Sequence, residues 1–522
     1  MTVEATSTLT VHVPGSPGYR EATAVYDLSA PALPDEAVIA DSVGSVAAAV
    51  ARARSRGLDV EVISTGHASS MAGRMVGALL VRTMPGGPVE VDPGTRRARI
   101  PAGTRWGAVA EAAAQHGLGC LHGSSADVGA VGYLLRGGLS FYGRRFGLAV
   151  NSVRAVELVV ADGRLHRVDA DHEPSLFWAI RGGGGGFGVV TAVEIELFDA
   201  ARVWTGADWW AVSDAGPLLD AWTSWTRTAP REVTTSFRIL RLPPLPGVPE
   251  PLTHGPVVCL DGVALATTPA EEPGVSAKVG DLLGRMHGVA TPVLATWRAA
   301  TTLDVPHTHM DPPDPLPFAG DHMVLRDLDS RGRRAFLSTA DAASQSPLVF
   351  SELRQLGGGL ADRVADGGAV NHLEGAYGYY ALAIAADEGQ APAIRRYLAQ
   401  ARAALAPWDT GSVVPNFVED RDNPGRWMNE ERAAFVDLVR RDVDPDGLFR
   451  RGVWPPRLTG HRRARRARSR QILKEVGNGA EGCVRTFRRP RTGGSHRGKR
   501  RAAGPAARSG PGPGDGVLRP PG

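Results

Sequence analysis

The sequence predicts a globular protein of mixed helices and strands in at least two domains, followed by a basic tail outside the fold. Three observations lead to this prediction. Hydrophobic residues make up 43% of the 522 residues, which is enough for a large core. Helical and strand-like spacings of apolar residues alternate over the first 200 residues, and the composition changes after them. Residues 457–522 carry 18 Arg or Lys against 3 Asp or Glu, whereas the first 456 residues carry 41 against 52.

The basic tail, residues 457–522, has almost no apolar periodicity and turns to Gly and Pro, so we expect it to be disordered. Its charge suits nucleic acid or an acidic partner, but we favour an uncommitted extension and do not expect nucleic-acid binding. No run of about 18 apolar residues predicts a membrane span. Residues 1–9 lack the basic and apolar regions of a signal peptide, so a cytoplasmic enzyme is predicted. Cys120, Cys259 and Cys483 form neither a disulfide framework nor a zinc set, and no metal is expected.

The first 200 residues supply most of the predicted elements. A helix that carries valines at helical spacing and ends at Gly57 separates strands at 37–41 and 58–62. The second strand alternates apolar and acidic residues, as a half-buried strand does. Thr104 is placed to cap a further helix. The other elements predicted here are hairpins over 89–100 and 153–168, helices over 104–117 and 174–180, and a strand over 189–197.

The chain after residue 200 indicates a second domain. Five tryptophans cluster between residues 204 and 225, and prolines become frequent. Strands are predicted at 348–356 and 377–385, and the domain is expected to end near Trp408. The segment Asp444–Phe449 then closes the folded part.

Five consecutive glycines, Gly182–Gly186, raise the question of what approaches the backbone there. They follow a predicted helix and precede a predicted strand, which is the reverse of the order in a dinucleotide-binding strand, glycine loop and helix. No Gly-Lys-Ser/Thr is present, so a nucleoside-triphosphate loop is excluded. A flexible linker is disfavoured because Phe177 and Trp178 before the run and Val189 and Val190 after it have core character.

Glycines also gather in Ser64-Thr65-Gly66-His67 and between Gly123 and Gly138. Glycine tolerates positive φ and lets backbone N–H groups point into a concavity. Several such loops suit a long anionic ligand such as a dinucleotide. Its pyrophosphate can be held by N–H groups alone, and Lys278 is the only lysine before the tail.

Taken together, these blocks resemble the berberine-bridge-enzyme-like flavoproteins, of the vanillyl-alcohol-oxidase or p-cresol-methylhydroxylase type. The resemblance spans roughly residues 14–455. It implies an α+β fold, with an FAD-binding domain built from both chain ends and a substrate domain whose antiparallel sheet is covered by helices. The implied division is 1–200 for the FAD-binding domain, 201–410 for the substrate domain, 411–456 for a return segment and 457–522 for the disordered tail. The matching blocks, in the family's order, are Ser64–His67, Gly123–Leu148, Leu176–Thr191, Asn416-Phe417 and Asp444–Phe449.

The resemblance implies FAD as the cofactor, with the glycine run beside it and Val189 and Val190 presenting backbone to it. His67 matches the histidine that bonds to the flavin 8α-methyl group. Ser125 stands where many members add a cysteinyl bond, so a single covalent link is implied. Arg136 replaces a common glycine, and we interpret its side chain as directed to solvent. The cofactor-binding residues implied are Ser64, Thr65, Gly66, His67, Ser124, Ser125, Val128, Gly129, Gly132, Tyr133, Gly137, Gly138, Val189, Val190 and Asn416.

The catalytic base departs from the family pattern. A tyrosine that the family often uses, in an Asn-Tyr-x-Arg-Leu segment, is replaced by Ala433, which cannot accept a proton. Other bases in the family come from the substrate sheet, where Glu352 lies on one predicted strand. On the other strand Tyr377 and Tyr379 share a face and Tyr380 takes the opposite one. Tyr379 or Glu352 is therefore the predicted base.

The function implied is that of an FAD-dependent oxidoreductase acting on a small molecule. A C–H group of an alcohol, a sugar or an amine would deliver hydride to flavin N5 while a base takes the proton, and O2 would reoxidise the flavin. The missing tyrosine leaves a non-redox cyclase or isomerase on the same scaffold as the alternative. A binding protein without activity would be expected to lack His67 and the glycine loops. Neither the substrate nor the oligomeric state follows from the sequence.

Overall fold

The computed structural model describes residues 9–244, 248–340, 346–385, 389–421 and 425–451. By its internal contacts the chain divides into two compact units, Met1–Arg457 and Leu458–Gly522. The second unit, which holds nearly all of the predicted basic tail, lies outside the described residues.

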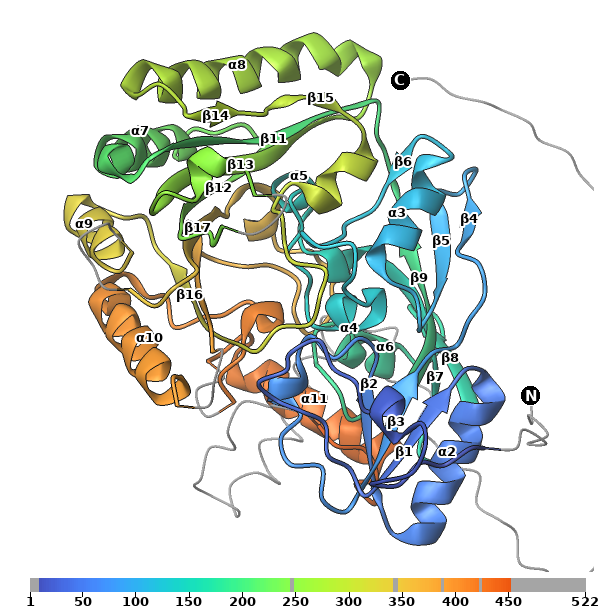
Figure 1. The fold of residues 1–522 in the computed structure, drawn as a ribbon. Coiled ribbons are helices and arrows are strands. Elements are labelled where there is room, and N and C mark those ends of the chain that lie inside the picture. The colour runs from blue at the N-terminus through green and yellow to red at the C-terminus, as the bar shows by residue number, and fades with distance from the viewer. Residues whose placement is uncertain (1–8, 245–247, 341–345, 386–388, 422–424, 452–522) are drawn as a thin grey trace, which may run out of the picture. The chain divides into compact units, whose positions relative to one another are not determined.

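A three-stranded parallel sheet forms the N-terminal part of the first unit, in the order β1-β3-β2 (Figure 1). Ser42 and Ser45 form a capping box at the start of helix α2, and Gly57 ends that helix in the left-handed conformation, as predicted. The central strand β3 is a nearly continuous apolar run, and the sequence analysis did not identify it. The bounds are β1 Glu36–Ala40, α2 Val43–Arg56, β2 Asp59–Ile63 and β3 Ala78–Thr83.

A five-stranded antiparallel sheet follows, in the order β4-β5-β9-β7-β8. The β4–β5 and β7–β8 pairs confirm the two predicted hairpins. The strand predicted after the glycine run is β9, which pairs with both hairpins at the centre of the sheet. The bounds are β4 Glu90–Asp92, β5 Arg97–Pro101, β7 Val153–Val159, β8 Leu165–Asp169 and β9 Val189–Glu196.

Short helices pack around these two sheets. Helix α3 begins after Arg105 and has no side-chain cap, so the predicted cap by Thr104 is wrong. Trp106 at its first turn is fully buried and lies edge-on against Tyr133 of α4. The bounds are α1 Tyr19–Ala22, α3 Trp106–Ala114, α4 Ala130–Leu135, α5 Gly143–Phe146 and α6 Pro174–Ile180, with a two-residue ladder between β6 Leu118–Gly119 and β10 Phe198–Asp199.

The second half of the chain forms an eight-stranded antiparallel sheet, in the order β14-β11-β13-β12-β17-β18-β16 with β15 beside β11. Its strands are β11 Arg202–Ala211, β12 Val233–Leu240, β13 Val257–Ala266, β14 Leu294–Ala295, β15 Arg298–Ala300, β16 Phe318–Leu325, β17 Phe350–Gln355 and β18 Tyr377–Ile384. Helices cover one face of this sheet, as Figure 1 shows. They are α7 Ala215–Thr226, α8 Glu272–Val289, α9 Ser330–Ser338 and α10 Ala391–Leu405. This sheet confirms the fold class that the family resemblance implied.

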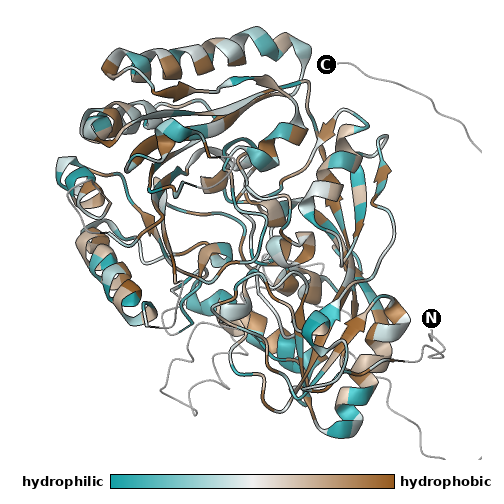
Figure 2. Ribbon diagram, viewed as in Figure 1, coloured by the Kyte–Doolittle hydropathy of each residue, from teal (hydrophilic) through white to brown (hydrophobic). Residues whose placement is uncertain are grey.

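The two faces of the large sheet differ in polarity. Side chains on the helix-covered face form one apolar core, in which Trp222, Phe237 and Tyr379 are fully buried. The helices that cover it mix hydrophobic and hydrophilic residues along their length, as Figure 2 shows for α8 and α10. The opposite face carries charged and hydroxyl side chains at alternate positions of the same strands, including Arg238 and Glu352. A buried polar face of this kind is a candidate location for a functional site.

The C-terminal end of the described chain returns to the first parallel sheet. Helix α11, Glu430–Val443, leads into a segment that runs beside β2: the N–H of Val60 donates to Leu448 O at 2.8 Å, and the N–H of Arg450 donates to Val60 O at 2.9 Å. Both chain ends therefore contribute to the same part of the fold, as the resemblance implied. In the described part of the chain, no helix is long and apolar enough to cross a membrane.

Candidate active site

The loop after β2 brings the sequence Ser64-Thr65-Gly66-His67 to one end of the parallel sheet. Gly66 has a φ of +76°, and a Cβ there would lie 2.7 Å from the backbone of Val25, so only glycine fits. The backbone N–H groups of Thr65, Gly66 and His67 donate to no other described residue. Gly66 is buried and its neighbours are half-buried, and N–H groups shielded from water are normally paired, so this loop is suited to receive an acceptor from a ligand.

His67 is held as a neutral imidazole. Its ring stacks on the ring of Tyr26, with centroids 3.9 Å apart, and its Nδ1 lies 2.8 Å from Thr65 Oγ1. Burial, reinforced by Arg105, lowers the pKa of His67 to about 4. A neutral ring keeps a nitrogen lone pair for bonding, which is what attachment to an electrophilic methyl group requires.

The glycine block from Gly123 to Gly138 packs against this loop. A Cβ on Gly129 would lie 3.0 Å from Ser64 Oγ, which shows how closely the two segments approach. Ser124 Oγ donates to Asp311 Oδ2 at 2.7 Å, and Ser125 Oγ accepts from the N–H of Asp127 at 3.2 Å. The serines that follow Gly123 are thus engaged with neighbouring side chains and turns.

The rest of the block contributes surface and packing. Gly132 is exposed with open space around it, and Val128 is half-buried against the core. Arg136 is half-buried rather than solvent-directed, and burial lowers its pKa to about 10. Cys120, just upstream, is 1% exposed within the core, as expected.

Asn416 ties the return segment to the glycine block. Its Oδ1 accepts from the N–H of Gly138 at 2.7 Å, and its Nδ2 donates to Tyr133 O at 2.9 Å. Gly137 precedes this contact, and both glycines have positive φ. The Asn416 amide therefore holds the end of the block in place through backbone contacts.

A side chain of the protein itself contacts the backbone of the glycine run. The guanidinium of Arg440, on α11, donates to Gly185 O at 2.8 Å and to Gly183 O, and it lies over the ring of Phe187. Val189 and Val190, which follow the run, are strand residues with buried side chains. The described contacts answer part of the question raised by the five glycines: a Cβ on Gly186 would lie 3.2 Å from Arg440 Nε, and one on Gly183 would lie 2.0 Å from Ala179 O.

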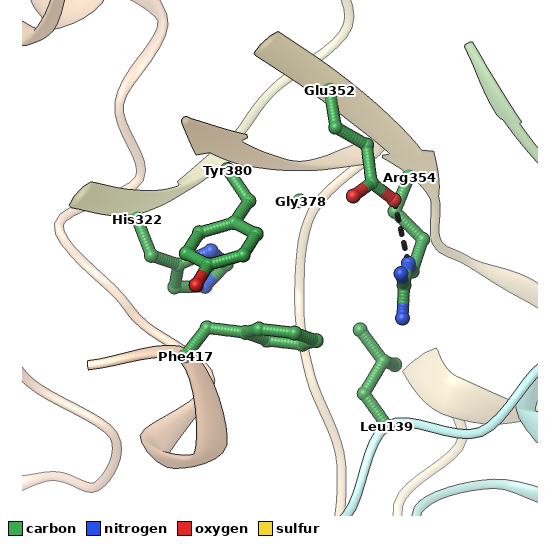
Figure 3. A pocket seen from close by; sticks show the side chains of 7 residues that line it. All are labelled: Leu139, His322, Glu352, Arg354, Gly378, Tyr380 and Phe417. Carbon is green, nitrogen blue, oxygen red and sulfur yellow. Dashed lines mark hydrogen bonds and ion pairs between the residues drawn. The ribbon is translucent and has the colours of Figure 1, made fainter. Parts of the chain in front are cut away.

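A narrow pocket lies on the polar face of the large sheet (Figure 3), and its side chains as they stand leave no room for a water molecule. Strands β16, β17 and β18 supply one wall. The return segment supplies Phe417, which follows Asn416, and the glycine block supplies Leu139, which follows Gly138. The pocket therefore adjoins the loops described above. Its lining residues are Leu139, His322, Glu352, Arg354, Gly378, Tyr380 and Phe417.

Of the two predicted bases, the structure brings only Glu352 to this pocket. Tyr379 points to the opposite face of the sheet, where it is 0% exposed and packs beside Phe336. Its strand neighbour Tyr380 faces the pocket instead, as period two requires and as Figure 3 shows. The tyrosine at the pocket is thus the one that the sequence analysis placed on the other face.

Glu352 belongs to a network of five buried charged or titratable side chains. Its Oε1 accepts from Arg354 Nε at 2.7 Å, and its Oε2 lies 3.3 Å from His309 Nε2. His309 Nδ1 lies 2.9 Å from Asp261 Oδ2, which in turn accepts from Arg238 Nη2 at 2.5 Å. All five residues are at most 4% exposed.

The protonation states in this network follow from its neighbours. Burial alone would raise the pKa of Glu352, but Arg354 and His309 outweigh it and hold that pKa far below its usual range. Burial and Arg238 would lower the pKa of His309, yet Asp261 and Glu352 outweigh them and raise it. Glu352 is therefore ionised, and a carboxylate of such low basicity is a poor proton acceptor.

His322 fixes the wall between sheet and return segment. Its Nδ1 donates to Tyr379 O at 2.7 Å, and its Nε2 accepts from the N–H of Val414 at 3.0 Å. Burial lowers the pKa of His322 to about 3, so it stays neutral. The two hydrogen bonds of this ring tie the return segment, including Phe417, to the sheet.

Tyr380 is paired with a carboxyl group from the return segment. Its hydroxyl donates to Glu419 Oε1. Burial raises the pKa of Glu419 to about 8. Asp27 and Asp321 act in the same direction, whereas the hydrogen bond from Tyr380 opposes them. This pair was not foreseen. Glu419 had no sequence signal, because its partner comes from a strand 39 residues earlier.

The network residues had a weak signal in the sequence. Arg238 and Asp261 are the charged residues of strands β12 and β13, whose other residues are apolar, glycine or hydroxyl-bearing, a pattern expected of a sheet with one polar, buried face. His309 lies outside any strand and offered none.

Comparison with known proteins identifies the cofactor domain. Residues 34–169 match the family described as FAD binding domain. These residues are an FAD-binding domain. They contain the His67 loop and the glycine block, and the fit is supported by the unpaired loop N–H groups and by Ser64 Oγ and Tyr133 Oη, which are buried without a partner among the described residues.

Curated relatives match part of this chain. The FAD-dependent monooxygenase sdcF of Emericella nidulans is 32% identical over 229 residues, 43% of this chain and 48% of the relative. The (R)-6-hydroxynicotine oxidase of Paenarthrobacter nicotinovorans is 35% identical over 181 residues, 34% of this chain and 40% of the relative. The chain thus spans less than half the length of each of these relatives in the matched region.

Solved structures share the fold over most of the chain. BBE-like 1 of Physcomitrella patens has a TM-score of 0.73 at 20% identity, covering 87% of this chain and 98% of that one. The 6-hydroxy-D-nicotine oxidase of Arthrobacter nicotinovorans has a TM-score of 0.74 at 22% identity, covering 87% of this chain and 100% of that one. The FAD-binding domain therefore sits in the fold of the berberine-bridge-enzyme-like FAD-linked oxidoreductases.

Proposed function

We propose that this protein is an FAD-dependent oxidoreductase that oxidises a C–H group of a small alcohol, sugar or other natural product. The observation that carries the proposal is the position of the pocket. Its lining joins the glycine block of the FAD-binding domain, through Leu139, to the polar face of the large sheet. When bound, FAD supplies the hydride acceptor, and the protein supplies orientation and proton transfer.

The flavin is held by the two glycine-bearing loops and linked through one residue. The neutral ring of His67, stacked on Tyr26, is the group that would bond to the 8α-methyl position. Ser125 replaces the cysteine of doubly linked relatives and cannot form a thioether, so the bond to His67 is the single link. Thr65, Gly66 and Gly129 shape the backbone that receives the phosphates.

The domain division follows the same logic. Residues 1–200 and 411–456 hold the cofactor, and residues 201–410 cover it with the large sheet. The parallel and five-stranded sheets both come from residues before 200, whereas all strands of the large sheet come from residues 202–384. The return segment closes against β2 and the glycine run, which supports its assignment to the cofactor domain.

The substrate binds between the flavin and the polar sheet face. Glu352, kept ionised by Arg354 and His309, is suited to hold a hydroxyl or amino group of the substrate rather than to accept its proton. Phe417 and Leu139 supply apolar contact on the opposite wall. Molecular oxygen is the proposed reoxidant, as the names of the oxidase relatives suggest.

The covalent flavin provides the first test. The purified protein should show a flavin absorbance spectrum, and after acid precipitation the yellow colour should remain in the pellet. His67→Ala should move the colour to the supernatant, whereas His116→Ala, an exposed histidine of the same domain, should leave it in the pellet.

Two results would revise the proposal to different extents. Yellow colour in the wild-type supernatant would keep the flavoenzyme and remove the bond to His67. A protein that binds no flavin, even after reconstitution with FAD, would overturn the oxidoreductase.

A further inference from the structure

We propose that Tyr380 and Glu419 form the proton-accepting pair of the reaction, with Tyr380 touching the substrate and Glu419 receiving the proton behind it. This inference rests on the proposed function and names the residues that the sequence analysis could not find. It assigns the base to a strand residue and a return-segment residue, neither of which was predicted in that role.

The geometry places the two groups in series from the pocket. The Tyr380 ring lines the pocket. Its centroid lies 5.2 Å from that of the Phe417 ring and 5.3 Å from that of the Phe350 ring. Its hydroxyl donates to Glu419 Oε1, so the carboxyl group lies on the far side of the tyrosine oxygen. The second oxygen, Glu419 Oε2, is buried and has no hydrogen-bond partner among the described residues.

Space for Glu419 depends on a glycine. Gly320 lies on β16 beside this pair, and a Cβ there would overlap Glu419 Oε2 and come within 3.0 Å of Tyr380 Cε2. Its backbone is ordinary strand, so the requirement is one of room and not of φ. The strand is thus shaped to admit a carboxyl group against Tyr380.

Every charged group that faces Glu419 favours the protonated carboxyl. Asp27 approaches from the N-terminal segment and Asp321 from β16, where Arg402 pairs with it. Asp311 and Glu352 face Tyr380 from the pocket side. A carboxyl group with a pKa near 8 exchanges its proton close to neutral pH, which suits a general base, whereas Glu352 is held ionised.

The proton and the electron pair are both accounted for in this step. The O–H or N–H bond of the substrate breaks, and its proton passes to Tyr380 Oη while the Tyr380 proton passes to Glu419 Oε1. The C–H bond at the carbon that bears this oxygen or nitrogen also breaks, and bound FAD would supply the acceptor for the hydride that leaves. The substrate becomes a carbonyl or an imine, its two electrons pass to that acceptor, and Glu419 is left protonated. This proton must leave Glu419 before the next turnover.

Titration of the carboxyl group is the first test and needs no substrate. Infrared difference spectra across a pH series should show a protonated carboxyl band that is lost with a midpoint near pH 8, with or without bound flavin. Glu419→Gln should remove this band, and Tyr380→Phe should shift its midpoint. If the wild-type spectrum contains no band that Glu419→Gln removes, the proposal is overturned.

Flavin reduction is the second test. Anaerobic bleaching is measured with a panel of primary and secondary alcohols, mono- and disaccharides and cyclic amines, and the best reductant of the wild type is then used. We expect Tyr380→Phe to lower the rate at least about 100-fold and Glu419→Gln to lower it about 10-fold or more and to abolish its rise through pH 8. Glu419→Asp should restore a pH-dependent rate.

Matched variants separate catalysis from folding. Tyr379→Phe changes the neighbouring hydroxyl on the other face and should keep the wild-type rate and pH profile. Gly320→Ala should displace Glu419 and lower the rate, whereas Gly284→Ala, in open space on α8, should not. Wild-type rates and pH profiles in flavin-bound Tyr380→Phe or Glu419→Gln would overturn the pair, even if stability fell. Failure of the proposed function itself would show in the wild type, as a protein without flavin or one that no compound reduces.

Discussion

At the scale of single residues, two acids beside Arg354 and Tyr380 of the pocket have opposite character. Glu352 lies beside cationic side chains and stays ionised, whereas Glu419 is buried near other acids and holds its proton. Glu352 lines the pocket, whereas Glu419 meets the hydroxyl of the pocket residue Tyr380. Environment, and not residue type, therefore decides which of them can accept a proton near neutral pH.

Glu419 should make the folded protein less stable as the pH rises. Its folded pKa is about 8, above the value of 4.5 for an unperturbed glutamate, so the folded state binds the extra proton between these values. That stabilisation is complete below pH 4.5 and is lost as the pH rises through 8. The unfolding free energy of the wild type relative to Glu419→Gln should fall by more than about 1 kcal/mol over this interval. Urea unfolding of both proteins at several pH values measures it, and a constant difference would contradict the assignment.

Glu352 should be required for stability as well as for the site. Glu352→Gln removes the negative charge that compensates Arg354 and His309, and it leaves their charge buried at no more than 4% exposure. We expect a loss of about 3 kcal/mol in unfolding free energy. Glu374→Gln, in a pair with Arg363 that is about two-thirds exposed, should cost less than about 1 kcal/mol. Chemical denaturation of the two variants distinguishes these outcomes.

At the scale of elements, the return helix α11 is fastened to the glycine run by one side chain. Arg440 is 1% exposed and donates to two carbonyl groups of the run. A Cβ on Gly186 would lie 3.2 Å from Arg440 Nε, so this side chain packs closely against the run there.

Replacing this arginine should loosen the helix. Arg440→Met leaves the carbonyls of Gly183 and Gly185 without their donor, and we expect a loss of about 3 kcal/mol because bonds to charged groups are among the stronger ones. Arg441→Met, one residue along the same helix and exposed, should change stability by less than about 0.5 kcal/mol. Thermal unfolding of both variants provides the comparison, and equal midpoints would contradict the role of Arg440.

Most elements with a clear period could be predicted from the sequence. The hairpins at β4–β5 and β7–β8, helix α2 with its Gly57 end, and strands β17 and β18 each had a local signal. Strand β3 was missed because a strand buried on both faces shows no alternation. Of the two predicted bases, Glu352 lines the pocket and Tyr379 does not, because period two cannot say which face of β18 meets the pocket. Glu419 and His309 depend on contacts between distant segments, which local patterns do not encode.

At the scale of the whole molecule, the basic tail should be dispensable. The first compact unit ends at Arg457, and the FAD-binding match and the pocket both lie within it. A chain ending after residue 457 should keep its flavin content and its rate of flavin reduction within about twofold, since no described site residue is removed. Side-by-side purification and bleaching of the full and shortened chains test this, and loss of flavin from the shortened chain would show that the tail takes part in the fold.

The segment from His309 to Leu316 connects two strands of the large sheet, β15 and β16, and contacts residues from the N-terminal part of the chain. Asp311 accepts from Ser124, the hydroxyl of Tyr26 donates to Pro312 O at 2.5 Å, and Leu316 pairs with the backbone on either side of Asp27. Tyr26 is also the residue on which His67 stacks. Exchange of residues 201–410 between relatives, by recombination or by design, would therefore disturb the residue on which His67 stacks unless the loop and its docking partners were inherited together.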